Sequence, residues 1–71
     1  MHRALGFLLA ALRVKPDWED VHQDVMMIYH QDGRKEDAVA QYRRLEETLR
    51  AMFNIGPTEN TRRVFEVISA S

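Results

Sequence analysis

A chain of 71 residues can form only one small domain. Such a domain buries about 60% of the surface that its unfolded chain exposes. The absence of cysteine excludes disulfides and thiolate metal sites and favours an intracellular setting. Ten basic and eleven acidic side chains nearly cancel, which argues against a strongly cationic surface for nucleic acid. We therefore expect a small core that needs a partner.

The first predicted element is a helix over residues 2–14. It ends before Lys15 and Pro16, because proline disfavours the α conformation in the residue before it. An apolar run behind a basic residue can also be a signal peptide, but Arg13 and Lys15 interrupt its end and no cleavage site of small residues follows. The run is too short to span a bilayer, so we expect no membrane segment.

Two further helices are predicted over residues 18–31 and 35–53. We expect Asp17 to cap the first of these, with acidic side chains in its first turn, and Gly33 to end it in a left-handed conformation. The second carries an apolar stripe in steps of four and three residues, which indicates one buried face. This stripe consists of Ala38, Tyr42, Leu45, Leu49 and Met52.

A short break separates this long helix from a fourth helix, predicted over residues 59–69. Asn54 tolerates a left-handed helix end, Pro57 prevents continuation, and Thr58 is placed to cap the new helix. We expect Ile55 to turn inward. This last helix has one apolar face, which consists of Val64, Phe65 and Ile68. The face predicts that the helix folds back as a lid over the preceding pair of helices.

Comparison of the chain with itself at a period of 34 residues adds a more specific pattern. The first and third helices share the spacing of the second helix of a tetratricopeptide repeat. The matched positions are Ala4 with Ala38, Leu8 with Tyr42, and Ala11 with Leu45. The pattern prefers tryptophan, glycine and proline where this chain has His22, Met26 and Arg50.

These patterns predict an all-α fold of tetratricopeptide-like antiparallel helical hairpins, with about four helices, the last one capping. We expect a single domain over residues 1–71. Residues 1–16 would be the second helix of a partial repeat, residues 17–53 the second repeat, and residues 58–71 the capping helix.

The stretch from Ala38 to Ile68 resembles the C-terminal end of the bacterial transcriptional activator domain. This domain is the tetratricopeptide-like module of the antibiotic regulatory protein family of transcription activators. There, a helix with a Tyr-x-Arg-Leu core leads through a Pro-Ser/Thr-x-x-Thr segment into a last helix with an aromatic and an aliphatic residue. The matching residues here are Ala38, Tyr42, Leu45, Ile55, Pro57, Thr58, Thr61, Phe65 and Ile68. Phe53, Asn54 and Gly56 depart from the family pattern.

The resemblance covers most of the chain but only about the second half of the family's domain, without its winged helix. It implies a non-enzymatic protein-interaction or oligomerisation module of a cytoplasmic bacterial transcription regulator, in which the winged helix makes the base contacts. Its partner would be a second copy of the chain or another domain of the regulator.

The first helix carries more apolar surface than one neighbour can cover, about 260° around its axis. One stripe can face the second helix and consists of Leu5, Leu8, Leu9 and Leu12. The other stripe predicts the interface of a homodimer and consists of Ala4, Phe7, Ala11 and Val14.

Candidate chemistry is sparse. His-Gln-Asp occurs twice, starting at His22 and His30, but residues eight apart on a helix lie about 12 Å apart, too far for one metal ion. We expect both tripeptides on a solvated helix. The hydroxyls of Thr58, Ser69 and Ser71 lack the sequence context of a nucleophile, so we expect neither an enzyme nor a cofactor.

Two arginine pairs, at residues 43–44 and 62–63, could form a phosphate-binding patch. Glutamates lie close to both pairs and can neutralise them, and no basic recognition helix is present. We expect no direct contact with nucleic acid.

The alternative function is a freestanding tetratricopeptide-type adaptor that binds a peptide of a partner protein. The first helix of each repeat lines the inner face of such an array. On the helix over residues 18–31, the candidate contacts for a peptide are Gln23, Met27 and His30. Two repeats offer little concave surface, and a lone methionine on a polar face is usually an ordinary exposed residue. We therefore favour self-association over peptide capture.

Overall fold

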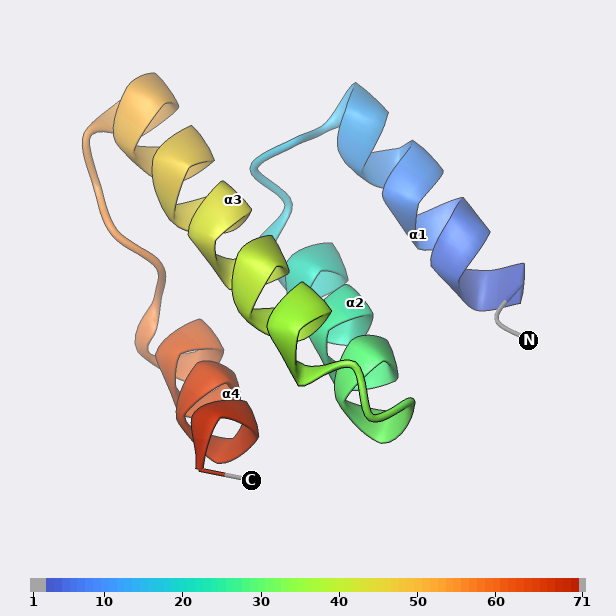
Figure 1. Cartoon of the computed structure of the whole chain (residues 1–71). Coiled ribbons are helices and arrows are strands. Elements are labelled where there is room, and N and C mark those ends of the chain that lie inside the picture. Colours follow the sequence, from blue (N-terminus) through green and yellow to red (C-terminus); the bar gives the residue numbers. More distant parts are fainter. Residues whose placement is uncertain (1–2, 71) are drawn as a thin grey trace.

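The computed structural model describes residues 3–70, which form helices joined by short turns (Figure 1). The helices are α1 (Arg3–Val14), α2 (Glu19–Gln31), α3 (Lys35–Phe53) and α4 (Glu59–Ser69). No strand occurs in this part of the chain, and α3 is the longest helix with 19 residues. The predicted all-α fold with four helices is confirmed. Position 2, where the sequence placed the start of the first helix, lies outside the described residues.

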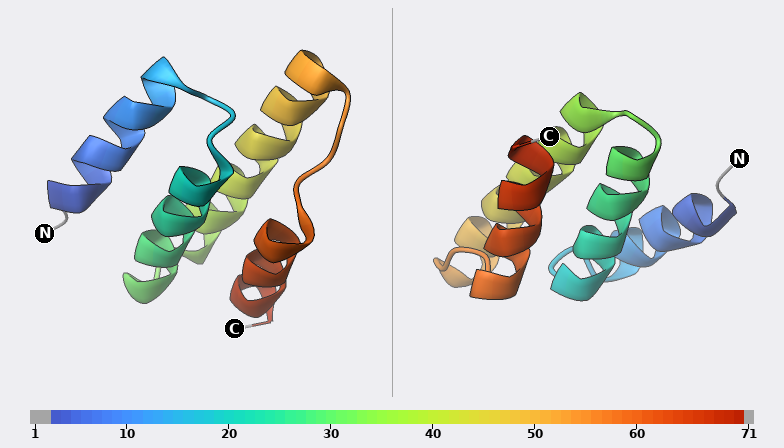
Figure 2. Two further views of the ribbon diagram at one scale, coloured as in Figure 1. Left: turned by 180° about the vertical axis from the view of Figure 1, so that it is seen from behind. Right: turned by 90° about the horizontal axis from the view of Figure 1, so that it is seen from below.

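Each helix runs antiparallel to the next, and α2 lies at the centre of the arrangement (Figure 1 and Figure 2). α2 contacts all three other helices, whereas α1 contacts no helix except α2. α4 folds back against both α2 and α3, in the position of the expected capping helix. α1 and α4 therefore form opposite edges of the domain, and only α1 has a single helical neighbour.

Two clusters of buried side chains hold the helices together. The first joins α2, α3 and α4 and consists of Met26, Ala38, Tyr42 and Ile68. The second joins α1 and α2 and consists of Leu12, Val21 and Val25. The ring of Phe65 on α4 stacks on Tyr42, with centroids 4.0 Å apart and the planes inclined by 12°. Ile68 is fully buried, and burying a side chain of this size stabilises by about 1.5–3 kcal/mol.

Two residues in the left-handed region end helices where the sequence predicts. Gly33 follows α2 with φ of 73°, and Asn54 follows α3 with φ of 56°. The N–H of Asn54 donates to the carbonyl of Arg50 at 3.0 Å, and that of Ile55 to the carbonyl of Leu49 at 3.4 Å. These bonds satisfy carbonyls that the end of α3 would otherwise leave unpaired.

The expected cap on α2 is wrong. Trp18, not Asp17, occupies the N-cap position, and no side chain caps the helix. A turn through Pro16 and Asp17 is closed by the N–H of Trp18, which donates to the carbonyl of Lys15 at 3.2 Å. This turn moves the helix start one residue along the chain, and the Asp17 carboxylate instead lies 3.6 Å from Nζ of Lys15.

The end of α3 is more open than expected. Met52 and Ile55 are each 50% exposed, whereas the apolar stripe and the turn predicted both to face inward. The last turns of α3 extend beyond the start of α4 (Figure 1). The left-handed turn at Asn54 redirects the chain, and Pro57 rather than Ile55 is buried.

Candidate interaction surface

The exposed side of α1 is an apolar surface that the fold leaves open. Phe7 is 78% exposed and Val14 is 88% exposed, and Ala4 lies on the same open side. Ala11 is half-buried, because it packs at the edge of the cluster between α1 and α2. We call Ala4, Phe7 and Val14, with Ala11 at the edge, the open face of α1.

The open face follows from the amphipathic pattern of α1 and from its position at the edge of the domain. Leucines pack against α2 and around the buried cluster there; they are Leu5, Leu8, Leu9 and Leu12. Because α2 is the only helix that contacts α1, nothing in the described residues covers the opposite side. A large exposed ring in an apolar surface is typical of an interaction site.

Shallow hollows flank Phe7 on both sides, each with a volume of about 500 Å³. One is lined by Phe7 together with Arg3, Gly6 and Ala10 of α1. The other lies between α1 and α2, where the ring of Phe7 faces Asp24 and Met27, among others. Phe7 is therefore a projecting ring between two depressions.

Two of the three residues considered for peptide binding on α2 already have partners within the domain. Nε2 of Gln23 donates to Oγ1 of Thr61 on α4 at 2.8 Å. Met27 is half-buried and packs against the cluster that joins α2, α3 and α4. His30 is half-buried in the last turn of α2. α4 thus occupies part of the surface that a peptide would need.

Glu19 fastens the start of α4 to the start of α2, a contact that the sequence did not predict. Its Oε2 accepts hydrogen bonds from the N–H and the hydroxyl of Thr58, at 3.0 and 2.9 Å, and from the hydroxyl of Thr61 at 2.5 Å. Thr58 is the N-cap residue of α4, as predicted, but its side chain makes no capping bond to the helix. Two threonines three residues apart lie on the same face of a helical turn. This spacing is the feature of the sequence that could have indicated a shared hydrogen-bond partner.

The pKa of Glu19 is lowered from its ordinary value. Partial burial by itself raises it, but the hydrogen bonds from Thr61 and Thr58 favour the carboxylate and outweigh burial. We call Glu19, Thr58, Thr61 and Gln23 the clasp, because they link α2 to α4 through one continuous set of hydrogen bonds.

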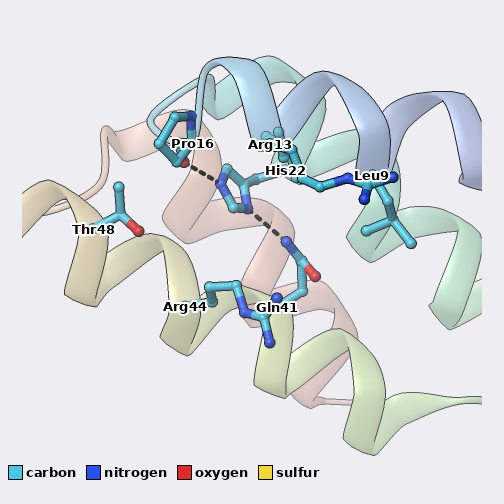
Figure 3. Close-up of a pocket in the computed structure, with 8 residues that line it drawn as sticks. Leu9, Arg13, Pro16, His22, Gln41, Arg44 and Thr48 are labelled. Atoms are coloured by element: carbon cyan, nitrogen blue, oxygen red, sulfur yellow. Dashed lines mark hydrogen bonds between the residues drawn. The ribbon is translucent and has the colours of Figure 1, made fainter.

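His22 is buried, and its expected location on a solvated helix face is wrong. Its ring Nε2 lies 2.8 Å from the carbonyl oxygen of Pro16, and its Nδ1 lies 2.8 Å from Nε2 of Gln41 (Figure 3). The imidazole therefore donates from Nε2 and accepts at Nδ1, which is a neutral tautomer.

Burial is the largest cause that lowers the pKa of His22, and the nearby charge of Arg44 acts in the same direction. The physical reason for burial is that His22 stands at an interior position of the repeat pattern.

One arginine from each of the two pairs is held by a glutamate. Arg43 lies 3.2 Å from Glu46, and Arg63 lies 2.7 Å from Glu59, both one helical turn away. No group of three metal-binding side chains converges anywhere in residues 3–70. None of the helices described is long and apolar enough to cross a bilayer.

Comparison with known families assigns the domain. A model of the bacterial transcriptional activator domain matches residues 1–69. The chain belongs to this family. The family is a regulatory one, so this bacterial transcriptional activator domain is part of a transcription regulator, as its resemblance predicted. No curated protein and no solved structure gives a significant match.

The structure gives a physical role to the segment that carries the family resemblance. In this bacterial transcriptional activator domain, Pro57 is buried in the turn, while the hydroxyls of Thr58 and Thr61 both donate to Glu19. Phe65 and Ile68 then pack against the core formed by α2 and α3. The segment closes the domain, and the open face of α1 lies at the other edge.

Proposed function

We propose that this domain is a non-enzymatic protein-interaction and oligomerisation module of a cytoplasmic bacterial transcription regulator. The open face of α1 is the surface on which two copies of the chain meet. The observation that carries the proposal is the 78% exposure of Phe7 in a helix that has one helical neighbour.

The shape of this surface favours a second copy as the partner. In a two-fold dimer each copy presents the same patch, so a projecting group must find a depression on an identical surface. Phe7 supplies the projection, and the hollows on either side of it supply the depressions. Burying one such ring stabilises by about 1.5–3 kcal/mol, and a two-fold interface buries it twice.

The charges beside Phe7 add complementarity. Arg3 lines one hollow and Asp24 lines the other, and within residues 3–70 neither side chain forms an ion pair. A two-fold axis close to the two Phe7 rings would bring Arg3 of one copy towards Asp24 of the other. This arrangement pairs two charges that the single chain leaves unpaired, which contributes to specificity more than to affinity.

Replacing Phe7 with glutamate tests the dimer. The mass of the parent chain, measured by sedimentation equilibrium over a range of concentrations, should rise to that of a dimer. Phe7→Glu should stay helical and raise the dissociation constant at least about a hundredfold, because a buried aromatic anchor becomes a charge. The matched control is Phe53→Glu, since Phe53 is also exposed but lies at the far end of α3.

Two results would contradict the proposal. One is a parent chain that remains a monomer at high micromolar concentration. The other is a Phe7→Glu variant that associates as well as Phe53→Glu does. A charge exchange gives an independent check: Arg3→Glu and Asp24→Arg should each weaken the dimer, and their combination should restore it.

Peptide capture on α2 is the second candidate. It requires Gln23 to leave Thr61 and a peptide to compete with α4 for the same surface. The open face of α1 needs no such rearrangement, which supports self-association as the function.

A further inference from the structure

A groove separates α1 from α3, because both helices pack against α2 but not against each other. It has a volume of about 490 Å³. Its apolar lining comes from Leu9, Leu12 and Pro16, and His22 with Gln41 lies between the two walls (Figure 3). A smaller hollow of about 210 Å³ extends it along α3, since Leu9, Gln41 and Arg44 line both spaces.

Two arginines that form no ion pair within residues 3–70 line this groove. Arg13 lines the wall formed by α1, where its side chain runs towards Leu9, and Arg44 lines the wall formed by α3 beside Gln41 (Figure 3). Within residues 3–70, neither of them forms an ion pair or a hydrogen bond, whereas Arg34, Arg43 and Arg63 are each held by a carboxylate. A guanidinium presents a planar set of donors that matches a carboxylate.

Three carboxylates around the groove already have partners. Asp37 lines the smaller hollow, but its Oδ2 lies 2.7 Å from Nε of Arg34. Asp17 pairs with Lys15, and Glu19 accepts the hydrogen bonds of the clasp. The charge of the two free arginines is therefore not neutralised by these groups.

The floor of the groove is polar but neutral. His22 and Gln41 are hydrogen-bonded to each other, and His22 also donates to the carbonyl of Pro16. Both side chains are buried and held in place, so the space is bounded by fixed groups rather than by mobile ones. Thr48 adds a hydroxyl to the wall formed by α3.

We propose that this groove binds a small organic acid, with its carboxylate at Arg44 and its apolar body against Leu9, Leu12 and Pro16. The volume suits a small molecule, because pockets for such ligands measure about 300–1,000 Å³. The site lies beyond the proposed dimer function: Phe7 does not line the groove, and ligand binding does not require the open face of α1.

The probes are 1-naphthoate and its neutral analogue 1-naphthamide, which has the same ring system without the charge. Two-dimensional NMR of the 71-residue chain at pH 7.5 measures their affinities and the positions of the shifted signals. Naphthoate should shift the methyl groups of Leu9 and Leu12 and the side-chain amide of Gln41. It should bind at least about tenfold more tightly than naphthamide, because the amide carries no charge for the arginines.

Arg44→Gln should weaken naphthoate binding at least about tenfold and leave naphthamide binding unchanged. Arg50→Gln is the matched control on the same helix, since it removes one exposed positive charge that does not line the groove. Glutamine and arginine have similar helix propensity, so both variants should stay folded. The Phe7→Glu variant should bind naphthoate as the parent does, which separates this site from the dimer.

The ring of His22 supplies a second readout. It faces Arg44 and Gln41 from α3 and Arg13 from α1, and the charges of Asp17 and Glu19 also act on it. A bound anion at Arg44 favours the charged imidazole, so naphthoate should raise the pKa of His22, whereas naphthamide should not. The titration is followed through the imidazole signals.

Each of the following results would overturn the proposal. Naphthoate and naphthamide could bind equally well, or the shifted signals could map to Phe7 and Val14 instead of the groove. Arg44→Gln could bind naphthoate as Arg50→Gln does. An acidic hexaglutamate peptide that binds at the groove more tightly than naphthoate would assign it to a protein partner instead of a small molecule.

Discussion

Replacing Glu19 with glutamine tests whether one carboxylate holds α4 in its position. Oε2 of Glu19 accepts three hydrogen bonds: from the N–H of Thr58 at 3.0 Å, from its hydroxyl at 2.9 Å, and from the hydroxyl of Thr61 at 2.5 Å. Glutamine keeps the length of the side chain and one acceptor oxygen but carries no charge. The variant therefore isolates the charge-assisted part of these bonds.

The expected loss in the free energy of unfolding is about 1–2 kcal/mol. A hydrogen bond to a charged group contributes about 1.5–3 kcal/mol, against about 0.5–1.5 kcal/mol for a neutral pair. Thr58 is exposed, so water competes for its two bonds and their contribution is small. Thr61 is fully buried, and most of the loss comes from its single bond to Glu19.

Urea unfolding at several pH values measures this loss and its origin. The pKa of Glu19 is lowered in the folded chain, because the bonds from Thr61 and Thr58 outweigh the effect of burial. A carboxylate of this kind stabilises the fold above its unfolded pKa, about 4.3, and stops doing so as the pH falls through its folded pKa. The difference in stability between the parent and Glu19→Gln should therefore be full at pH 7 and shrink below about pH 4.3.

The matched control is Glu47→Gln, which removes one exposed charge from α3 that forms no ion pair within residues 3–70. It should change the free energy of unfolding by less than about 0.5 kcal/mol. The reasoning would be refuted if Glu19→Gln were as stable as Glu47→Gln at pH 7. It would also fail if the difference between Glu19→Gln and the parent persisted unchanged in acid.

Two further predictions concern the core. Ile68→Ala should lower the free energy of unfolding by about 2–5 kcal/mol, because Ile68 is fully buried against α2 and α3. A loss below about 1 kcal/mol in urea unfolding would mean that α4 is a dispensable tail. Burial lowers the pKa of His22, so stability should be full above about pH 6.5 and decline as the pH falls towards the folded pKa. Thermal unfolding should show that His22→Gln abolishes this decline and that the control His30→Gln retains it.

The surface proposed for dimerisation could be predicted from the sequence, for a simple physical reason. An amphipathic helix with an apolar arc wider than one neighbour covers must leave part of it open. α1 has only α2 as a helical neighbour, and Phe7 and Val14 lie on the open side. The exception is Ala11, which is half-buried and packs at the edge of the cluster between α1 and α2.

The sequence by itself determined the number of helices and where most of them end, because these depend on local backbone preferences. Gly33 and Asn54 adopt the left-handed conformation that the sequence predicts, and Pro57 prevents the third helix from continuing. The recurrence of small and large apolar residues at a period of 34 residues also predicted antiparallel hairpins. The helix ends are a property of a few neighbouring residues, and the repeat is a pattern in the sequence itself.

The tertiary structure alone decided which polar groups meet. Glu19 lies 39 residues from Thr58 and 42 residues from Thr61, and Gln41 lies 19 residues from His22. No periodicity relates such partners, since their approach depends on how α2 packs against both α3 and α4. The same holds for the groove between α1 and α3, which exists because both helices pack on α2 and leave a space between them.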